Sequence, residues 1–349
     1  MEFGFELAVC QWAERHWPPD GERDSAVFVA RQLGTKHRRL DTVVLECDPE
    51  GLARRARFGD RHLDSDLLGV VRHAPAEWAW YRDALPEPDY PWRYVREAVT
   101  RAADRGLVER RTRGGRVQLR RRWPYPDWVE RIVAVENKPD LSASAARDLV
   151  RQLQQDVALG LADEVWVATG TDQATAALLG DGPVEAGILA VDTTDRGAGA
   201  AHTVWRPRRL AVEERGTRIL DRPEGGGHDA SAWRFEYASA DWKKRKRLEI
   251  AERAYERGWR AYVESMRSDC RHFEMRPTTA VAQPFCPAKG HHQTTRECSG
   301  DCPSFEPEPP AWRQQGWPVE GGPGQAVERL LDRQRARHRP EPPGREERD

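Results

Sequence analysis

A strand–helix–strand pattern in the middle of the chain limits its fold more than any other feature. Apolar runs typical of buried strands occupy residues 132–136, 165–169 and 188–191, and a helical repeat of apolar residues covers 143–159. A helix between two such strands is the right-handed crossover that a parallel strand pair requires. The pattern therefore predicts an α/β fold with a partly parallel sheet, and a further short helix is expected at 173–179.

The start of the chain predicts a helix followed by two more strands. Phe5, Ala8, Val9 and Trp12 recur at helical spacing, an apolar run follows at residues 26–30, and residues 40–47 are rich in β-branched side chains. We expect these strands to join the same sheet, with 40–47 beside 132–136.

Size and composition restrict where the protein works. The chain has 349 residues, of which 38% are hydrophobic and 32% charged, so we expect a modest core with exposed helices. No apolar run approaches the roughly 20 residues that a bilayer span needs, and the first residues lack the basic and apolar parts of a signal peptide. These features predict a cytoplasmic protein without a membrane partner.

A helix followed by a hairpin lies between the predicted strands. Apolar residues repeat at helical spacing over 95–102, Gly106 is placed to end that helix, and two strands flank Gly114 and Gly115. This order is typical of a winged helix. Eleven Arg against three acidic residues lie between Arg93 and Arg122, and the excess predicts contacts with the phosphates of DNA. The candidate contacts are Arg93, Arg96, Arg101, Arg113 and Arg116. A solvated basic face is the alternative.

Four cysteines near the end of the chain suggest a metal site. Cys270, Cys286, Cys298 and Cys302 fall within 33 residues, enough for a tetrahedral Zn²⁺ or an Fe–S cluster. Both metals remain open, and so do free thiols, because the paired C-x₂-C units of a zinc ribbon are absent. Cys10 and Cys47 stand alone, and we expect them to be small core residues.

Charged side chains at the ends of two predicted strands suggest a second metal site. Glu136 and Lys138 are two residues apart on one strand and share a face, and Asp41 begins the strand expected beside it. Two carboxylates suit Mg²⁺ or Mn²⁺, and a lysine beside them can orient a water and hold a phosphate. Structural salt bridging of Lys138 with a carboxylate is the alternative interpretation.

Lysine is scarce in this chain, which makes Lys138 more informative. There are only 6 Lys against 50 Arg, and no other Lys lies between Lys36 and Lys243. A compact ammonium beside a metal is a role that the planar fork of Arg fills badly. The Arg surplus itself suits nucleic-acid binding, but GC-rich codon usage explains it equally well.

These motifs resemble those of the PD-(D/E)xK nuclease superfamily, which has the restriction-endonuclease-like fold. The similarity rests on Asp41, on the segment Val135-Glu136-Asn137-Lys138 and on the Gln-bearing helix after it. It implies Asp41 and Glu136 as metal ligands, Lys138 as the catalytic lysine, Gln152 or Gln155 as the polar residue of the next helix, and Glu6 or Glu14 as the acid of the first helix. The whole chain also resembles an uncharacterised family of halophilic archaea, with the same Glu-Asn-Lys-Pro-Asp segment and late cysteines.

The resemblance implies a nuclease that hydrolyses DNA phosphodiester bonds with Mg²⁺ or Mn²⁺. The alternatives are a non-catalytic DNA-binding or regulatory protein with the same fold, and a metal-stabilised module that binds a protein. We expect a mixed sheet flanked by helices, with an inserted winged helix and a Cys-rich metal-binding segment. The expected parts are a core (1–48 and 123–220), the insertion (49–122), a linker with a long helix (221–268), the Cys segment (269–305) and a disordered tail (306–349). The long helix is expected over residues 240–266 and begins with the basic run 243–247, and one short helix is expected within the tail at 326–331.

Overall fold

The computed structural model describes most of the chain. It covers residues 2–21, 24–139, 143–170, 182–193, 200–221, 233–278, 281–308 and 323–343, with the side chains of 143–147 and 323–325 excepted. The helix expected at residues 173–179 lies outside these ranges. Among the described residues, no helix is long and apolar enough to cross a bilayer.

A six-stranded mixed sheet forms the centre of the fold, in the order β1-β2-β6-β7-β8-β9. The β1–β2, β2–β6 and β8–β9 pairs are antiparallel, whereas β6–β7 and β7–β8 are parallel. The predicted crossover is present, because α6 joins the parallel strands β6 and β7. The strand bounds are Ala26–Gly34 (β1), Arg39–Cys47 (β2), Val129–Asn137 (β6), Glu164–Gly170 (β7), Gly187–Val191 (β8) and Ala201–Trp205 (β9).

Helices cover both faces of this sheet, as expected for a mixed α/β fold. On one face α6 (Ala143–Leu159) and α8 (Ala240–Arg257) pack against Val43, Ile132 and Val165. On the other face α1 (Glu2–His16) packs against Val44 and Val133. Cys10 and Cys47 are fully buried in these layers, which confirms them as small core residues.

The long helix expected over residues 240–266 is interrupted. Helix α8 ends at Arg257, Gly258 has φ +60, and a 3₁₀ helix, η2 (Trp259–Ser265), follows. The break has a packing reason, because Tyr255 belongs to the core on one face of the sheet and Tyr262 to the core on the other. The chain turns at Gly258 to reach the second face, in a backbone conformation that glycine adopts without a steric penalty.

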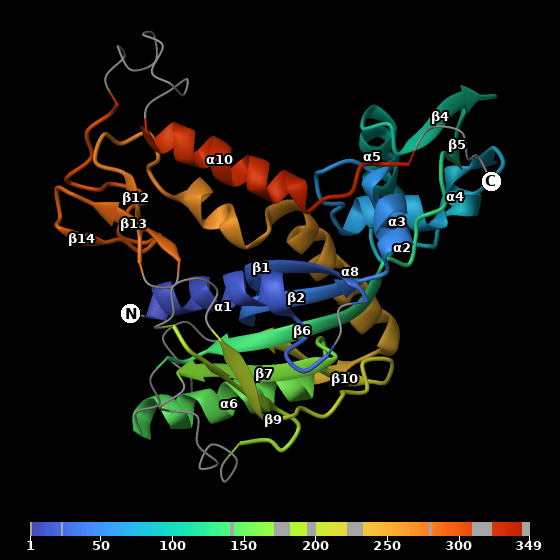
Figure 1. The fold of residues 1–349 in the computed structure, drawn as a ribbon. Coiled ribbons are helices and arrows are strands. Elements are labelled where there is room, and N and C mark those ends of the chain that lie inside the picture. The colour runs from blue at the N-terminus through green and yellow to red at the C-terminus, as the bar shows by residue number, and fades with distance from the viewer. Residues whose placement is uncertain are drawn as a thin grey trace.

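Residues 49–123 form a lobe with its own hydrophobic core (Figure 1, upper right). The predicted helix is α5, Gly106 has φ +70 beyond its end, and the β4–β5 hairpin turns at Gly114 and Gly115, both with positive φ. Sequence reasoning missed three short helices and strand β3 in this region. The elements are Pro49–Ala56 (α2), Ser65–His73 (α3), Ala79–Trp80 (β3), Tyr81–Ala84 (α4), Trp92–Asp104 (α5), Val108–Arg113 (β4) and Arg116–Arg121 (β5).

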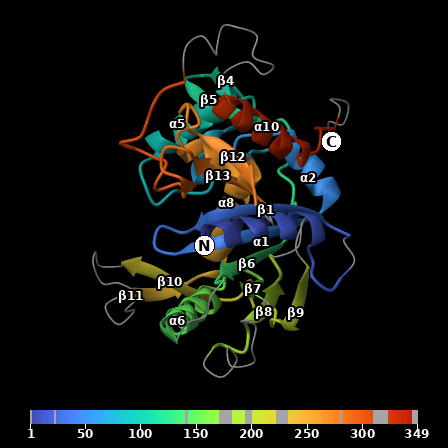
Figure 2. The same cartoon turned by 60° about the vertical axis from the view of Figure 1, so that its left-hand side comes forward.

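The Cys-rich segment forms a small sheet of its own, close to the start of α1 (Figure 2). Its strands are Glu274–Pro277 (β12), Ala282–Cys286 (β13) and His291–His292 (β14), and a separate two-stranded ribbon pairs Gly216–Asp221 (β10) with Arg234–Ala238 (β11). The tail expected to be disordered contains a helix, α10 (Pro323–Arg337), whose Val327 and Leu331 pack against the core beside η2.

Candidate functional site: an acidic pocket beside the central sheet

The structure places Asp41 and Glu136 on neighbouring strands. The β2–β6 ladder ends where Thr42 pairs with Val135, and Asp41 and Glu136 are the next residues on the two strands. The prediction that these two strands are neighbours is confirmed. Val133 and Val135 belong to the core of the opposite face, so the expected alternation along β6 is confirmed as well.

Asp41 is held by two amide groups. The backbone N–H of Asn137 donates to Oδ2 at 3.2 Å, and the Gln32 side-chain Nε2 donates to Oδ1 at 3.4 Å. Burial and the neighbouring charge of Glu136 raise the pKa of Asp41 to about 6. Two carboxylates that lie close together in a buried place repel each other when both are charged, and a bound cation offsets that repulsion.

Both carboxylate oxygens of Glu136 meet a cation. The carboxylate is only 3% exposed; Arg38 Nη2 donates to Oε2 at 3.0 Å, and Lys138 Nζ lies 3.4 Å from Oε1. Lys138 also donates to Glu2 Oε1 at 3.2 Å. Burial acts to lower the pKa of Lys138, but the charges of the three carboxylates around it outweigh burial, so its pKa is raised and the ammonium stays charged.

Arg38 and Asp156 belong to this site, and sequence reasoning missed both. Arg38 donates to both oxygens of Asp156, at 2.7 and 2.6 Å, and Asp156 is 4% exposed. The sequence does indicate Asp156, because this residue follows Leu149 and Leu153 on the apolar stripe of α6. A carboxylate in that buried position needs a partner. Arg38 lies in a short turn between β1 and β2, where no periodicity indicates the direction of a side chain.

The glutamines of α6 do not reach this group. Among the described residues, no hydrogen bond joins Gln152 or Gln155 to Asp41, Glu136 or Lys138, and Gln152 Oε1 is buried without a partner. Asp156, one position beyond Gln155, is the residue of α6 that connects to Glu136, through Arg38.

The acid of the first helix that lies at the site is Glu6. It accepts from Arg31 Nη2 at 2.7 Å and from Gln32 Nε2 at 2.8 Å, so Gln32 bridges Glu6 and Asp41. Gln32 has φ +56, a left-handed conformation that is uncommon for a residue other than glycine. Glu14 is instead paired with Arg260 at 2.6 Å, on a part of α1 remote from Asp41 along the helix.

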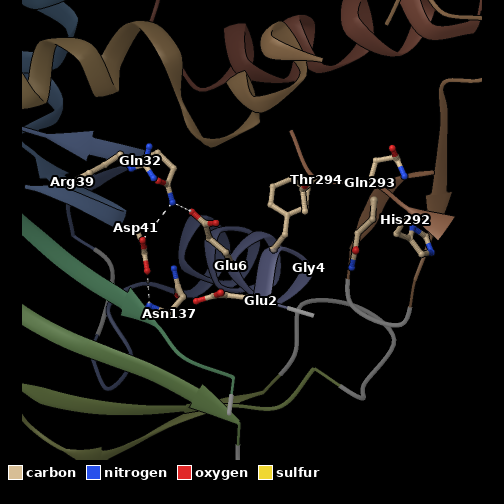
Figure 3. Close-up of a pocket in the computed structure, with 12 residues that line it drawn as sticks. Glu2, Gly4, Glu6, Gln32, Arg39, Asp41, Asn137, His292, Gln293 and Thr294 are labelled. Atoms are coloured by element: carbon tan, nitrogen blue, oxygen red, sulfur yellow. Dashed lines mark hydrogen bonds between the residues drawn. The ribbon is translucent and has the colours of Figure 1, made fainter. Parts of the chain in front are cut away.

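An open pocket of about 390 Å³ lies over Asp41 and Glu6, between the central sheet, α1 and the Cys-rich segment (Figure 3). Asp41, Glu6 and Gln32 line it from the core. Gln283, His292, Gln293 and Thr294 line it from the small sheet around β13 and β14. The Cys-rich segment therefore forms one wall of the pocket. The sequence gives no sign of this contact, because the segment is far from Asp41 along the chain.

Asp41 and Glu136 are the two carboxylates that could hold a magnesium or manganese ion, and each of their oxygens already has a hydrogen-bond or ion-pair partner. Within the described ranges, no three His, Cys, Asp or Glu side chains are grouped as a closed metal site requires. Mg²⁺ needs no such group, because proteins bind it through one or two carboxylates, with water and substrate phosphate supplying the rest. Asn137, which also lines the pocket, is 1% exposed, and its Oδ1 is buried without a hydrogen-bond partner.

The four late cysteines are close in space but are not arranged as metal ligands. Burial raises the pKa of Cys298, and the negative charges of Cys270, Cys302 and Cys286 raise it further, which places all four in one neighbourhood. Cys286 sits at a tight turn, since its C=O accepts from the N–H groups of Lys289 and Gly290. The predicted single coordination sphere is not found among the described side chains.

The predicted DNA-contact arginines differ in their surroundings. Arg113 and Arg116 are exposed at the tip of the β4–β5 hairpin, and Arg93 and Arg96 are exposed on α5. Arg101 is not free, because it is paired with Asp64 at 2.9 Å and with Asp66 at 3.0 Å. The basic run at the start of α8 is not a uniformly solvated face either, since Lys243 is 1% exposed and donates to the C=O of Ala211.

Fold and site together define an α/β protein with an acidic pocket beside a mixed sheet, next to a buried group of carboxylates paired with Arg38 and Lys138. Residues 28–307 match the model of a family of unknown function, DUF5787. The match covers more than half of the sequence, so the chain belongs to this family. No curated protein and no solved structure matches it.

Proposed function

We propose that this protein is a metal-dependent nuclease that hydrolyses DNA phosphodiester bonds, and that its core is a restriction-endonuclease-like domain of the PD-(D/E)xK superfamily. The observation that carries the proposal is the placement of Asp41 and Glu136 side by side on β2 and β6, with Lys138 beside Glu136. In the same proposal, residues 49–122 are an insertion that contains a winged helix.

In this mechanism Asp41 and Glu136 hold Mg²⁺ or Mn²⁺. When bound, such an ion lowers the pKa of a water and neutralises charge that develops on the phosphate. Lys138 stays protonated among its carboxylates, so its ammonium binds the scissile phosphate or orients the attacking water. Arg38 fixes the direction of the Glu136 carboxylate, while Gln32 and the N–H of Asn137 orient Asp41.

The test is cleavage of duplex DNA by the full chain with Mg²⁺ or Mn²⁺, in the wild type and in Asp41→Asn, Glu136→Gln and Lys138→Arg. Cleavage should fall by roughly a hundredfold or more in each variant, because charge stabilisation at the reacting phosphate typically contributes that much. Lys244→Arg is the matched control, since Lys244 is exposed on α8, and it should keep wild-type activity. Cleavage that persists in EDTA, or wild-type activity in Lys138→Arg, would overturn the proposal.

One observation favours the second candidate, a non-catalytic DNA-binding or regulatory protein. Arg38 and Lys138 occupy both oxygens of Glu136, so the charge of that carboxylate is already compensated. This candidate expects DNA binding without cleavage under any divalent metal, and Glu136→Gln should then leave DNA affinity unchanged.

The late cysteines form a second part of the proposal. We propose that Cys270, Cys286, Cys298 and Cys302 bind a structural Zn²⁺ or an Fe–S cluster, which would draw the neighbouring thiols into one coordination sphere. The clustering that raises the pKa of Cys298 supports the proposal. Metal analysis of the purified full chain should give about one zinc, or a cluster's iron with sulfide, per chain, and Cys298→Ser should lose it. Metal-free protein with an unchanged melting temperature in chelator would contradict it.

A further inference from the structure

The outer face of the small sheet β3-β5-β4 concentrates arginine and tryptophan. The register places Arg113 opposite Arg116, Arg111 opposite Gln118, and Glu109 opposite Arg120, all on one face. Trp80 pairs with Gln118 on the same face, and Trp78 lies two residues before it. The other face buries Leu119 and Val108 in the core of the lobe, and Trp80 is the residue named on the outer face that also packs against that core.

Tryptophan rings hold these guanidinium groups in place. Trp78 lies against two of them, with the Arg111 Cζ 4.2 Å and the Arg120 Cζ 4.9 Å from its ring centroid. Trp80 lies against Arg116 at 4.8 Å and Arg82 at 5.7 Å. A guanidinium that stacks on a ring is already ordered before a ligand arrives. Arg111 Nε donates to Gln118 Oε1 at 2.8 Å and Arg120 Nε to Glu109 Oε2 at 2.7 Å, so a ligand meets the remaining N–H groups of these two side chains.

The net charge of this face is positive. Arg82, Arg111, Arg113, Arg116 and Arg120 contribute to it, and Glu109, which pairs with Arg120, is the one carboxylate that the register puts there. Helix α5 of the same lobe differs, because its Arg101 is neutralised by two aspartates. A polyanion therefore finds fixed cations on the sheet rather than at that position of the helix.

The rings favour phosphate over bases as the contacted group. Unpaired bases bind proteins by stacking on free aromatic faces. Trp78 and Trp80 are only partly exposed and already carry arginines, whereas the guanidinium edges match the two oxygens of a phosphate. The chemistry fits the sugar–phosphate backbone of duplex DNA.

We propose that the outer face of β3-β5-β4 binds the phosphate backbone of the duplex that the protein acts on. This inference rests on the proposed function for the identity of the polyanion. Figure 1 shows the lobe apart from the start of α1, where the pocket lies, so the face holds DNA outside the place of cleavage. Its loss should raise KM for DNA and leave kcat unchanged.

The experiment measures binding of a fluorescein-labelled 20-base-pair duplex to the full chain by anisotropy, in EDTA, over a range of salt concentrations. Arg111→Gln and Arg116→Gln should each weaken binding by roughly five- to tenfold at moderate salt and lower the slope of log K against log salt by about 0.9. Arg101→Gln is the matched control from the same lobe, and its affinity and slope should stay at the wild-type values.

Two further variants test the arrangement itself. Glu109→Gln removes the carboxylate from the face and should bind the duplex more tightly, a gain that loss of folding cannot imitate. Trp78→Leu should weaken binding without changing the salt slope, because the ring orders cations but contacts no phosphate. Equal slopes in the wild type, Arg111→Gln and Arg116→Gln, or unchanged affinity in Glu109→Gln, would overturn the proposal.

The outcomes separate this inference from the nuclease proposal, since binding is measured without a divalent metal. Cleavage by the wild type with unchanged binding in all face variants would refute the surface and leave the nuclease standing. The expected binding pattern without cleavage under any metal would refute the nuclease and leave the surface standing. Binding of an acidic protein but not of DNA would refute the surface as a DNA site.

Discussion

The pocket and the helix–hairpin lobe use the same residue type in opposite ways. Near the pocket, Arg38 and Arg31 are about nine-tenths buried, and their guanidinium groups form ion pairs with carboxylates. In the lobe, Arg111 and Arg116 stack on tryptophans, and no ion pair within the described residues joins either of them to a carboxylate. An arginine surplus in a sequence therefore mixes two populations, one that compensates buried charge and one that offers charge to a partner.

The sharpest way to break this contrast is to remove one arginine from each region. Arg38→Met leaves Asp156 and Glu136 buried without their shared cation, and we expect it to lower the free energy of unfolding by about 3–5 kcal/mol. Arg101→Met removes an arginine that is 48% exposed, and it should cost about 0–1 kcal/mol. Urea denaturation of both variants measures the difference, and equal losses would show that the buried group is not an ionic network.

A second prediction concerns the pH dependence of stability at the pocket. The pKa of Asp41 is raised to about 6 in the folded chain, above about 3.9 for an unfolded aspartate. The folded state therefore binds more protons between these values, and Asp41 costs stability progressively as the pH rises through that window. In EDTA, Asp41→Asn should be more stable than the wild type at pH 8 by about 1–3 kcal/mol, and equal to it near pH 4. A constant difference across the range would contradict the raised pKa.

The prediction with the smallest expected effect tests the backbone conformation of Gln32. Gln32→Ala and Gln32→Gly both lose the hydrogen bonds to Glu6 and Asp41, but only glycine relieves the φ of +56. We expect the glycine variant to be the more stable by about 1 kcal/mol in thermal or urea unfolding. A more stable alanine variant would show that position 32 is not left-handed in solution.

Sequence reasoning was most successful where periodicity acts over a long segment. The repeat over residues 143–159 matches α6 at both ends, and the strands that carry Asp41 and Glu136 are neighbours as expected. Apolar alternation identifies the face on which a carboxylate lies. It therefore predicted which two acids could meet.

The sequence could not show which distant residues form ion pairs with each other. Arg38 lies in a turn, and its two carboxylates come from β6 and from α6, 98 and 118 residues away. Asp156 was detectable as a charge on an apolar stripe, but nothing in the sequence names its cation. The break at Gly258 was missed for a similar reason. The apolar repeat continues through Gly258, but the residues before it pack on one face of the sheet and those after it on the other.

That break also has a consequence for how the protein behaves in a crowded solution. β1 is an edge strand, and an uncovered edge is where a second chain can add a strand. α8 and η2 both contact β1, so the chain wraps around the β1 edge where it turns at Gly258. β9, at the opposite edge, remains partly exposed, with Trp205 at 41%. The segment around Gly258 thus hinders strand addition at the β1 edge, and β9 is the edge strand that lacks this cover from α8 and η2.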